Sequence, residues 1–294
     1  MPGADDILLT IPNVSEGRDE NVIAQIGDAF ASTGARLLDV HSDADHHRSV
    51  YTLAGDTDTI VSALVAGARA CAELIDLNDL NDPRGSHPHV GALDVAPVVY
   101  LDVARRGAAC AAALVAGEEL GRAGLPVLLF GELAGGRSRA ELRAGGLVAL
   151  TERIAHGELT LDFGPPRPDP RTGAVLIAAR PPLVAFNVEL APPATLDAAR
   201  AIAALIREGG EHGLPGVRAL GIELTARNPP VAQVSTNVED HRRTSLAQLV
   251  AAVTRHAAVT RCELVGLAPE AAFVGFPQDV PVANRRTLED ALSS

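Results

Sequence analysis

The sequence predicts an α/β (α+β) sandwich made of two subdomains of the ferredoxin-like kind. In the N-terminal half, strand-length apolar runs and helix-length amphipathic runs follow in the order strand, helix, strand, strand, helix. Roughly the same order returns in the C-terminal half. A chain of 294 residues has room for two domains of ordinary size, and its 47% apolar residues can fill two cores.

The elements of the N-terminal half follow from the spacing of apolar residues. Short apolar runs bounded by turn residues predict strands, and apolar residues three and four positions apart predict helices. We expect strands at 7–12, 35–40, 49–54, 92–101 and 125–130, and helices at 20–32, 57–75 and 104–124.

The C-terminal half repeats this pattern after a proline-rich segment. We expect strands at 183–190, 217–224 and 231–236, and helices at 195–209 and 246–256. The segment 162–173, DFGPPRPDPRTG, can continue neither a helix nor a central strand. We interpret it as an ordered crossing between two domains, 1–179 and 180–294, or as a plain structural linker.

The composition excludes several classes of protein. A formal net charge of −12 argues against a nucleic-acid-binding protein, which usually carries a basic face. Three widely separated cysteines suit a reducing compartment, and the N-terminus lacks the pattern of a secretory signal. The sequence contains no run of about 18 apolar residues, which a membrane-spanning helix would need. We therefore expect a cytoplasmic protein.

The sequence also lacks the motifs of the commonest α/β enzymes. It contains no GxxxxGK[ST] phosphate loop, no GxGxxG after a strand, no GxSxG and no HExxH. These absences argue against a P-loop ATPase, a dinucleotide-binding enzyme of the usual kind and an α/β-hydrolase.

A dense group of histidines and aspartates lies at 39–48, DVHSDADHHR. A loop could fold His41, Asp43, Asp45 and His46 around a divalent ion, although the spacing matches no familiar metal motif. The alternative is a polar turn, in which Asp and Ser side chains bond their own backbone.

A second histidine group lies at 85–94, GSHPHVGALD. His87 precedes Pro88, which favours an extended backbone, and Gly85 and Gly91 permit a close approach of a ligand. A histidine fixed at a strand entrance suits proton transfer near neutral pH. The alternative is an inert loop histidine.

Several collinear motifs together resemble the formiminotransferase family, that is, the glutamate formimidoyltransferase domain. The resemblance covers nearly the whole chain in order, and it is far more specific than any single motif. It is carried by PNVSEGR at 12–18, LLDVHSDADHHR at 37–48, HPHVGALDVAP at 87–97, AFNV at 185–188, AQVSTN at 232–237 and ELVGL at 263–267.

The resemblance implies a fold and a reaction. Members have two α/β subdomains with a folate-binding cleft or tunnel between them, and are expected to be homodimers. They transfer the formimino group of N-formimino-L-glutamate to N5 of tetrahydrofolate, in histidine degradation and one-carbon metabolism. Tetrahydrofolate is the co-substrate and no metal is expected. In bifunctional members a cyclodeaminase domain follows, which we expect to be absent because this sequence ends at Ser294.

The resemblance also implies which residues form the site. His87 corresponds to the catalytic acid and base, and His41 stands near it. Arg48, Asp94, Arg180 and Asn187 match positions expected to bind substrate. The folate-binding segment corresponds to Gly164, Pro165, Pro166, Arg167, Pro168, Asp169, Pro170, Arg171, Thr172 and Gly173.

The sequence departs from the family at several of these positions. His41 stands where the family usually has Asp, and His47 where Asn is common. The folate segment lacks the apolar and aromatic residues that would stack on a pterin. Three alternatives follow: a paralogue acting on another amidine, metal-assisted hydrolysis using His41, His46, His47 and His87, or a non-catalytic folate-binding protein.

Overall fold

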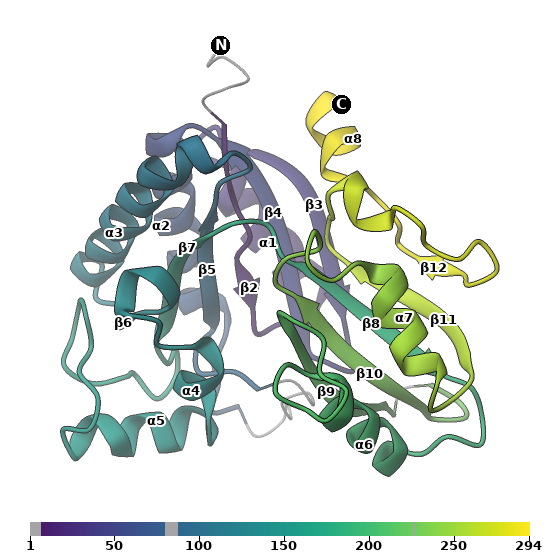
Figure 1. The fold of residues 1–294 in the computed structure, drawn as a ribbon. Helices are drawn as coiled ribbons and strands as arrows, with labels where there is room; N and C mark the ends of the chain where they lie inside the picture. The colour runs from purple at the N-terminus through teal and green to yellow at the C-terminus, as the bar shows by residue number, and fades with distance from the viewer. Residues whose placement is uncertain (1–6, 80–87, 226) are drawn as a thin grey trace. The chain divides into compact units, whose positions relative to one another are not determined.

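The computed structural model describes residues 7–79, 88–225 and 227–294 (Figure 1). The chain divides into two compact units, Met1–Pro181 and Pro182–Ser294. Both units combine helices with a β-sheet, which confirms the predicted α+β fold of two subdomains.

Unit 1 is built on a mixed seven-stranded sheet. β4 pairs with β3 on one side and with β1 and β2 on the other, and β1 and β2 also pair with β5, all antiparallel. β7 then joins β5 and β6 in parallel. The elements are β1 (Leu8–Thr10), β2 (Asn13–Val14), α1 (Glu20–Ala31), β3 (Arg36–Asp43), β4 (Arg48–Gly55), α2 (Thr57–Leu74), β5 (Leu93–Val99), α3 (Arg106–Arg122), β6 (Val127–Leu129), α4 (Arg139–Arg143), α5 (Gly146–Ala155) and β7 (Val175–Arg180).

The larger core of unit 1 lies between the sheet and α1, α2 and α3. Asp19 and Asp56 start α1 and α2 by accepting hydrogen bonds from backbone N–H groups of the first turn. Phe30 of α1 packs on Tyr51 of β4, with ring centroids 5.2 Å apart. A Cβ atom at Gly67 of α2 would collide with the Phe30 ring, so this helix approaches closely only because residue 67 is glycine.

The opposite face of the same sheet carries a smaller core and the polar groups described below. Side chains alternate along a strand, so Leu128 and Leu176 point away from the larger core. Leu142 of α4 and Leu150 of α5 pack with them. The short helix α4 is thereby held against this second face.

Unit 2 has the order β-α-β-β-α-β, followed by a short strand and a helix (Figure 1). Its sheet order, β12-β11-β8-β10-β9, places β10 between β8 and β9, as a split βαβ unit requires. The elements are β8 (Val184–Leu190), α6 (Leu196–Ile206), β9 (Val217–Leu224), β10 (Val231–Val238), α7 (Leu246–Thr254), β11 (Val259–Val265), β12 (Val282–Ala283) and α8 (Leu288–Ser293). One face of this sheet packs against α6 and α7 through aliphatic side chains and Phe186.

Most elements expected from the sequence are present, with ends that differ by a few residues. The expected strand at 49–54 is part of β4, and the expected helix at 246–256 contains α7. The sequence did not predict β2, β7, β11, β12, α4, α5 or α8. The proline-rich segment 162–173 lies within unit 1 and leads into β7. Among the described helices, none is both long enough and apolar enough to span a membrane.

Candidate active site

The centre of the site in unit 1 is a buried carboxylate on β5. Asp94 is 0% exposed. Its Oδ2 accepts hydrogen bonds from Nη2 of Arg48, at 2.8 Å, and from Nη2 of Arg143, and its Oδ1 accepts from the backbone N–H of Val90 at 2.8 Å. One carboxylate thus joins β4, α4 and the loop before β5.

This ion-pair network is charged at neutral pH. Burial raises the pKa of Asp94, but the charges of Arg143 and Arg48 and the hydrogen bond from Val90 outweigh burial and bring the pKa to about 2. Burial lowers the pKa of Arg48 to about 10, against the opposing effect of Asp94. Asp94 and Arg48 therefore keep their charges near pH 7, and the carboxylate of Asp94 faces the guanidinium groups of Arg48 and Arg143.

Arg48 also fixes the loop that follows the predicted catalytic histidine. Its Nη2 donates to the carbonyl of Pro88 at 3.1 Å, and its Nη1 donates to Oδ1 of Asn13 at 3.1 Å. His87, the residue before Pro88, lies outside the described residues, and its role stays a prediction. The chain immediately after it is held by Arg48 at Pro88 and by Asp94 at Val90.

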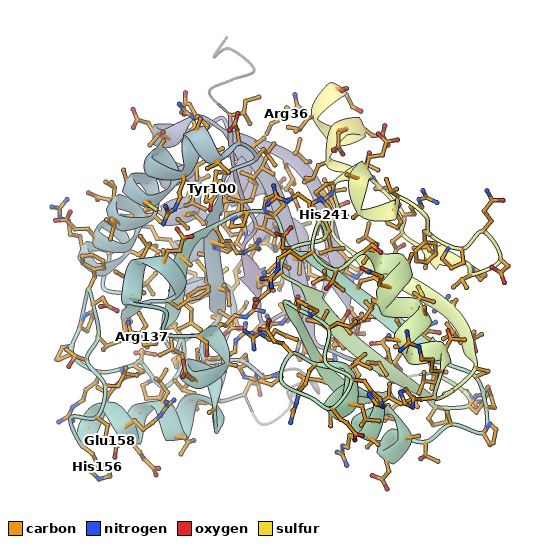
Figure 2. The ribbon with its side chains drawn as sticks, viewed as in Figure 1. Arg36, Tyr100, Arg137, His156, Glu158 and His241 are labelled. Atoms are coloured by element: carbon orange, nitrogen blue, oxygen red, sulfur yellow. The ribbon has the colours of Figure 1, made fainter. Side chains whose placement is uncertain are left out.

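Two further arginines complete a cluster of four. Arg139 lies one helical turn before Arg143 in α4, and its side chain is half-buried. Burial and then the charges of Arg143, Arg180 and Arg48 lower the pKa of Arg139 to about 9. Arg180 ends β7, where its carbonyl accepts a hydrogen bond from the N–H of Tyr100 at 3.2 Å; Tyr100 is labelled in Figure 2.

The histidine-rich stretch forms the connection between β3 and β4. Oδ1 of Asp43 accepts from the N–H of His46 at 2.7 Å and lies 2.8 Å from His46 Nδ1. Burial raises the pKa of Asp43, but His46, with help from His41, outweighs it and lowers the pKa to about 2. His47 is buried with φ of 52°, and its Nδ1 accepts from the N–H of Gly17 at 3.0 Å. The stretch is therefore organised as a polar turn.

His41 lies on the same face of the sheet as Arg48. In the β3–β4 pair His41 is opposite Val50, and Asp43 is opposite Arg48, so these four side chains point to one side. Nε2 of His41 is buried and has no hydrogen-bond partner among the residues the structure describes. An imidazole in this state has a donor or acceptor to offer to a ligand.

The folate-binding segment of the prediction forms a tight turn. Asp169 and Gly173 exchange backbone hydrogen bonds of 3.3 Å and 2.6 Å, and Oδ1 of Asp169 accepts from the N–H groups of Arg171 and Thr172. Gly173 has φ of 73°, and a Cβ there would collide with the carbonyl of Val90. The turn is thus tied to the loop that carries Val90. Arg171 of this turn pairs at 3.0 Å with Asp76, and both are exposed.

Asn187 belongs to a polar face of the sheet in unit 2, opposite the helices. It is 3% exposed, and its Nδ2 lies 3.4 Å from Oε2 of Glu263. On the same face Glu189 holds Arg261 through two hydrogen bonds of 2.8 Å. Gln233 of β10 lies opposite Glu189 in the β8–β10 pair. It is fully buried, and neither of its polar side-chain atoms has a hydrogen-bond partner among the described residues.

The sequence did not point to Arg139 or Arg143 as site residues, and Gln233 appeared only within the family motif AQVSTN at 232–237. The available signal was the spacing of two arginines, RAELR at 139–143, which places both on one side of a helical turn. Gln233 alternates with buried Val234 along β10 and gave no separate signal.

Comparisons with known proteins show the family. The family model described as the formiminotransferase domain, N-terminal subdomain, matches residues 7–180, and that of the formiminotransferase domain matches residues 185–278. The chain belongs to the formiminotransferase family. The boundary between the two matches lies beside the boundary between the two units.

Curated relatives of this formiminotransferase chain extend over most of its length. A glutamate formimidoyltransferase of Thermoplasma acidophilum is 35% identical over 90% of this chain and 88% of its own. The enzyme of the same name from Streptococcus pyogenes is 33% identical over 91% of each chain. A formimidoyltransferase-cyclodeaminase of Gallus gallus is 37% identical over 90% of this chain and 50% of its own. The chain spans about half the length of this Gallus relative.

Proposed function

We propose that this protein transfers the formimino group of N-formimino-L-glutamate to N5 of tetrahydrofolate, as a step of histidine degradation and one-carbon metabolism. The observation that carries the proposal is the match to proteins named glutamate formimidoyltransferase over about nine tenths of both chains. The arginine cluster of unit 1 supports it, because a donor with two carboxylates needs cationic partners. We place the protein in the cytoplasm as a homodimer.

The reaction needs one group that can both accept and donate a proton. N5 attacks the amidine carbon of the donor, and the bond from that carbon to the glutamate nitrogen breaks. N5 loses a proton, and the departing glutamate nitrogen gains one. A histidine near neutral pKa can carry this proton in both directions. We assign the role to His87 on the motif it shares with the family.

Arg48 and Asp94 serve this chemistry as positioning residues. They hold the carbonyl of Pro88 and the N–H of Val90 through hydrogen bonds of 3.1 Å and 2.8 Å. Both side chains are nearly inaccessible to solvent, so the loop after His87 rests on a rigid support. Because Arg48 and Asp94 bond this loop directly, we expect a substitution of either residue to lower the rate of proton transfer by His87.

The remaining predicted residues receive roles in binding. We assign His41 to binding one of the two substrates through its Nε2, which has no partner among the described residues, and we assign Arg180 to binding a substrate carboxylate. We assign Asn187 to substrate as well, and the turn 164–173 to tetrahydrofolate. The exposed guanidinium of Arg167 gives this turn a cation for a folate carboxylate.

Release of glutamate tests this proposal against hydrolysis. With N-formimino-L-glutamate as donor, transfer forms one glutamate for each tetrahydrofolate consumed, and none without the folate. Hydrolysis of the donor would release glutamate in the absence of folate. Folate binding without any glutamate release would instead identify a binding protein.

A further inference from the structure

The arginine cluster of unit 1 has more positive charge than its own carboxylate can balance. Arg48 and Arg143 both bond to Oδ2 of Asp94, while Oδ1 of the same carboxylate accepts from Val90. The charges of Arg139 and Arg180 add to theirs. Among the described residues, Asp94 is the carboxylate that bonds both Arg48 and Arg143, and Arg139 bonds none, so positive charge is in excess beside this buried network.

Arg139 differs from the other arginines of its segment. Arg137 donates to the carbonyl of Leu129 and pairs with Asp162 at 2.6 Å; it is labelled in Figure 2. Arg153 donates to the carbonyls of Glu141 and Leu142 at 2.9 and 2.8 Å. Arg139 has neither a hydrogen bond nor an ion pair with any residue that the structure describes.

A half-buried, unpaired guanidinium beside three others is unfavourable for the folded protein without a ligand. Like charges repel each other, and partial burial weakens the solvation that would otherwise offset the repulsion. An anion that binds here would remove both costs. The planar fork of a guanidinium matches a carboxylate with two parallel hydrogen bonds.

We propose that Arg139 binds a carboxylate of the amino-acid donor, and that this contact selects donors with two carboxylates. The inference rests on the proposed function for the identity of the donor. Tetrahydrofolate also ends in a glutamate moiety, but that moiety is far from N5. The donor carboxylates lie a few bonds from the reacting carbon, and the cluster contacts Pro88, the residue after His87.

The test compares Arg139→Gln with Arg139→Lys and with a control, Arg122→Gln. Arg122 is exposed, and its ion-pair partners among the described residues are Glu118 and Glu119 of its own helix. We expect Arg139→Gln to raise the KM for N-formimino-L-glutamate by about 10- to 100-fold, with the KM for tetrahydrofolate changed less than about 3-fold. Arg139→Lys should recover part of the loss, and Arg122→Gln should behave as wild type.

Two results would overturn the inference. An unchanged donor KM in Arg139→Gln would remove Arg139 from donor binding. A raised KM for tetrahydrofolate alone, abolished when tetrahydropteroate without glutamate is the acceptor, would assign Arg139 to the folate tail instead.

A titration without turnover separates this inference from the proposed function. We expect glutarate to bind wild type at least about 10-fold more tightly than Arg139→Gln, and butyrate to show no such difference. If the wild type binds glutarate in this way and catalyses no transfer, the proposed function fails, while the binding of a dicarboxylate by Arg139 stands. If transfer occurs but the two proteins bind glutarate equally, the inference fails and the function holds. Thermal unfolding adds a readout: a structural role predicts a lower Tm for Arg139→Gln, whereas a ligand-binding role predicts an equal or higher one.

Discussion

The buried carboxylate of Asp94 lies 2.8 Å from Nη2 of Arg48, and the same Nη2 donates to the carbonyl of Pro88. One guanidinium therefore couples a charge on β5 to the loop that follows His87. Three segments that are distant in the sequence, β4, β5 and the loop at Pro88, meet at this pair.

Arg48→Lys should lower kcat by about 10²-fold, because a single ammonium cannot replace the planar guanidinium that bonds Asp94, Asn13 and Pro88 together. Steady-state kinetics measures this effect. A stable Arg48→Lys variant with wild-type kcat would contradict the positioning role.

Asp94→Asn should lower the free energy of unfolding by about 3–5 kcal/mol, because it removes one partner of a buried ion pair. Urea denaturation measures this loss.

His41→Ala should separate function from stability. Nε2 of His41 is buried and has no partner in the part of the chain that the structure describes, so removing this side chain should change the free energy of unfolding by less than about 1 kcal/mol. We expect the same substitution to lower kcat/KM by more than about 10-fold, and His41→Asp, the family residue, to keep more activity than His41→Ala. If His41→Ala were strongly destabilised with normal kinetics, His41 would be a structural residue.

The pH dependence of the free energy of unfolding should show the contribution of the ionised Asp43 carboxylate to stability. Its pKa is about 2 in the folded protein, below the ordinary value of 3.8. A lowered carboxyl pKa stabilises the fold above the unfolded pKa, and this contribution disappears as pH falls from about 4 to 2. Asp43→Asn should therefore be less stable than wild type by about 2 kcal/mol at pH 7 and nearly equal to it at pH 2. A constant difference across this range would contradict the depressed pKa.

Gln233→Met should stabilise the protein. Gln233 is fully buried, and neither polar atom has a partner among the described residues, so a side chain of similar shape without an amide avoids about 1–2 kcal/mol of desolvation. Urea denaturation of unit 2 within the full chain measures the gain. A loss of stability would show that the amide is hydrogen-bonded in solution.

Treatment with a chelator should leave the transfer rate unchanged. A protonated amidine is already electrophilic, and Asp43 and Nδ1 of His47 already bond within the protein. Metal analysis of native and chelator-treated protein provides the measurement. A stoichiometric metal whose removal abolishes activity would favour the hydrolytic alternative that uses His41, His46 and His47.

The elements with strong periodicity could be predicted from the sequence, and the shorter ones could not. The run SVYTLA identifies β4 because Val50, Tyr51 and Thr52 are residues with high β propensity, and the structure buries this run on both faces. The helix α4 has five residues with one buried apolar side chain, Leu142, which is too short for a helical period to be recognised. β7 begins directly after the proline-rich turn, so the sequence pattern did not show where the turn ends and the strand begins.

The same limit applies to the site. The motifs around His41 and His87 identified the two loops, and Arg48 and Asp94 were named individually. The sequence did not predict that Arg48 and Arg143 both bond the carboxylate of Asp94, because these partners are 46 and 49 residues away from Asp94 in the sequence. Arg139 has no partner within 7–79, 88–225 and 227–294, where Asp94 already bonds Arg48 and Arg143, and no local sequence pattern predicts this.

Formimino transfer with His87 as the proton-transfer group is tested most directly by an assay of wild-type protein with N-formimino-L-glutamate and tetrahydrofolate, followed by acid treatment and measurement of the absorbance of 5,10-methenyltetrahydrofolate. We expect a time-dependent signal that requires both substrates and falls by about 10²-fold or more in His87→Ala. No signal from wild type at high enzyme concentration would contradict the transfer, and an unchanged rate in His87→Ala would contradict the role of His87.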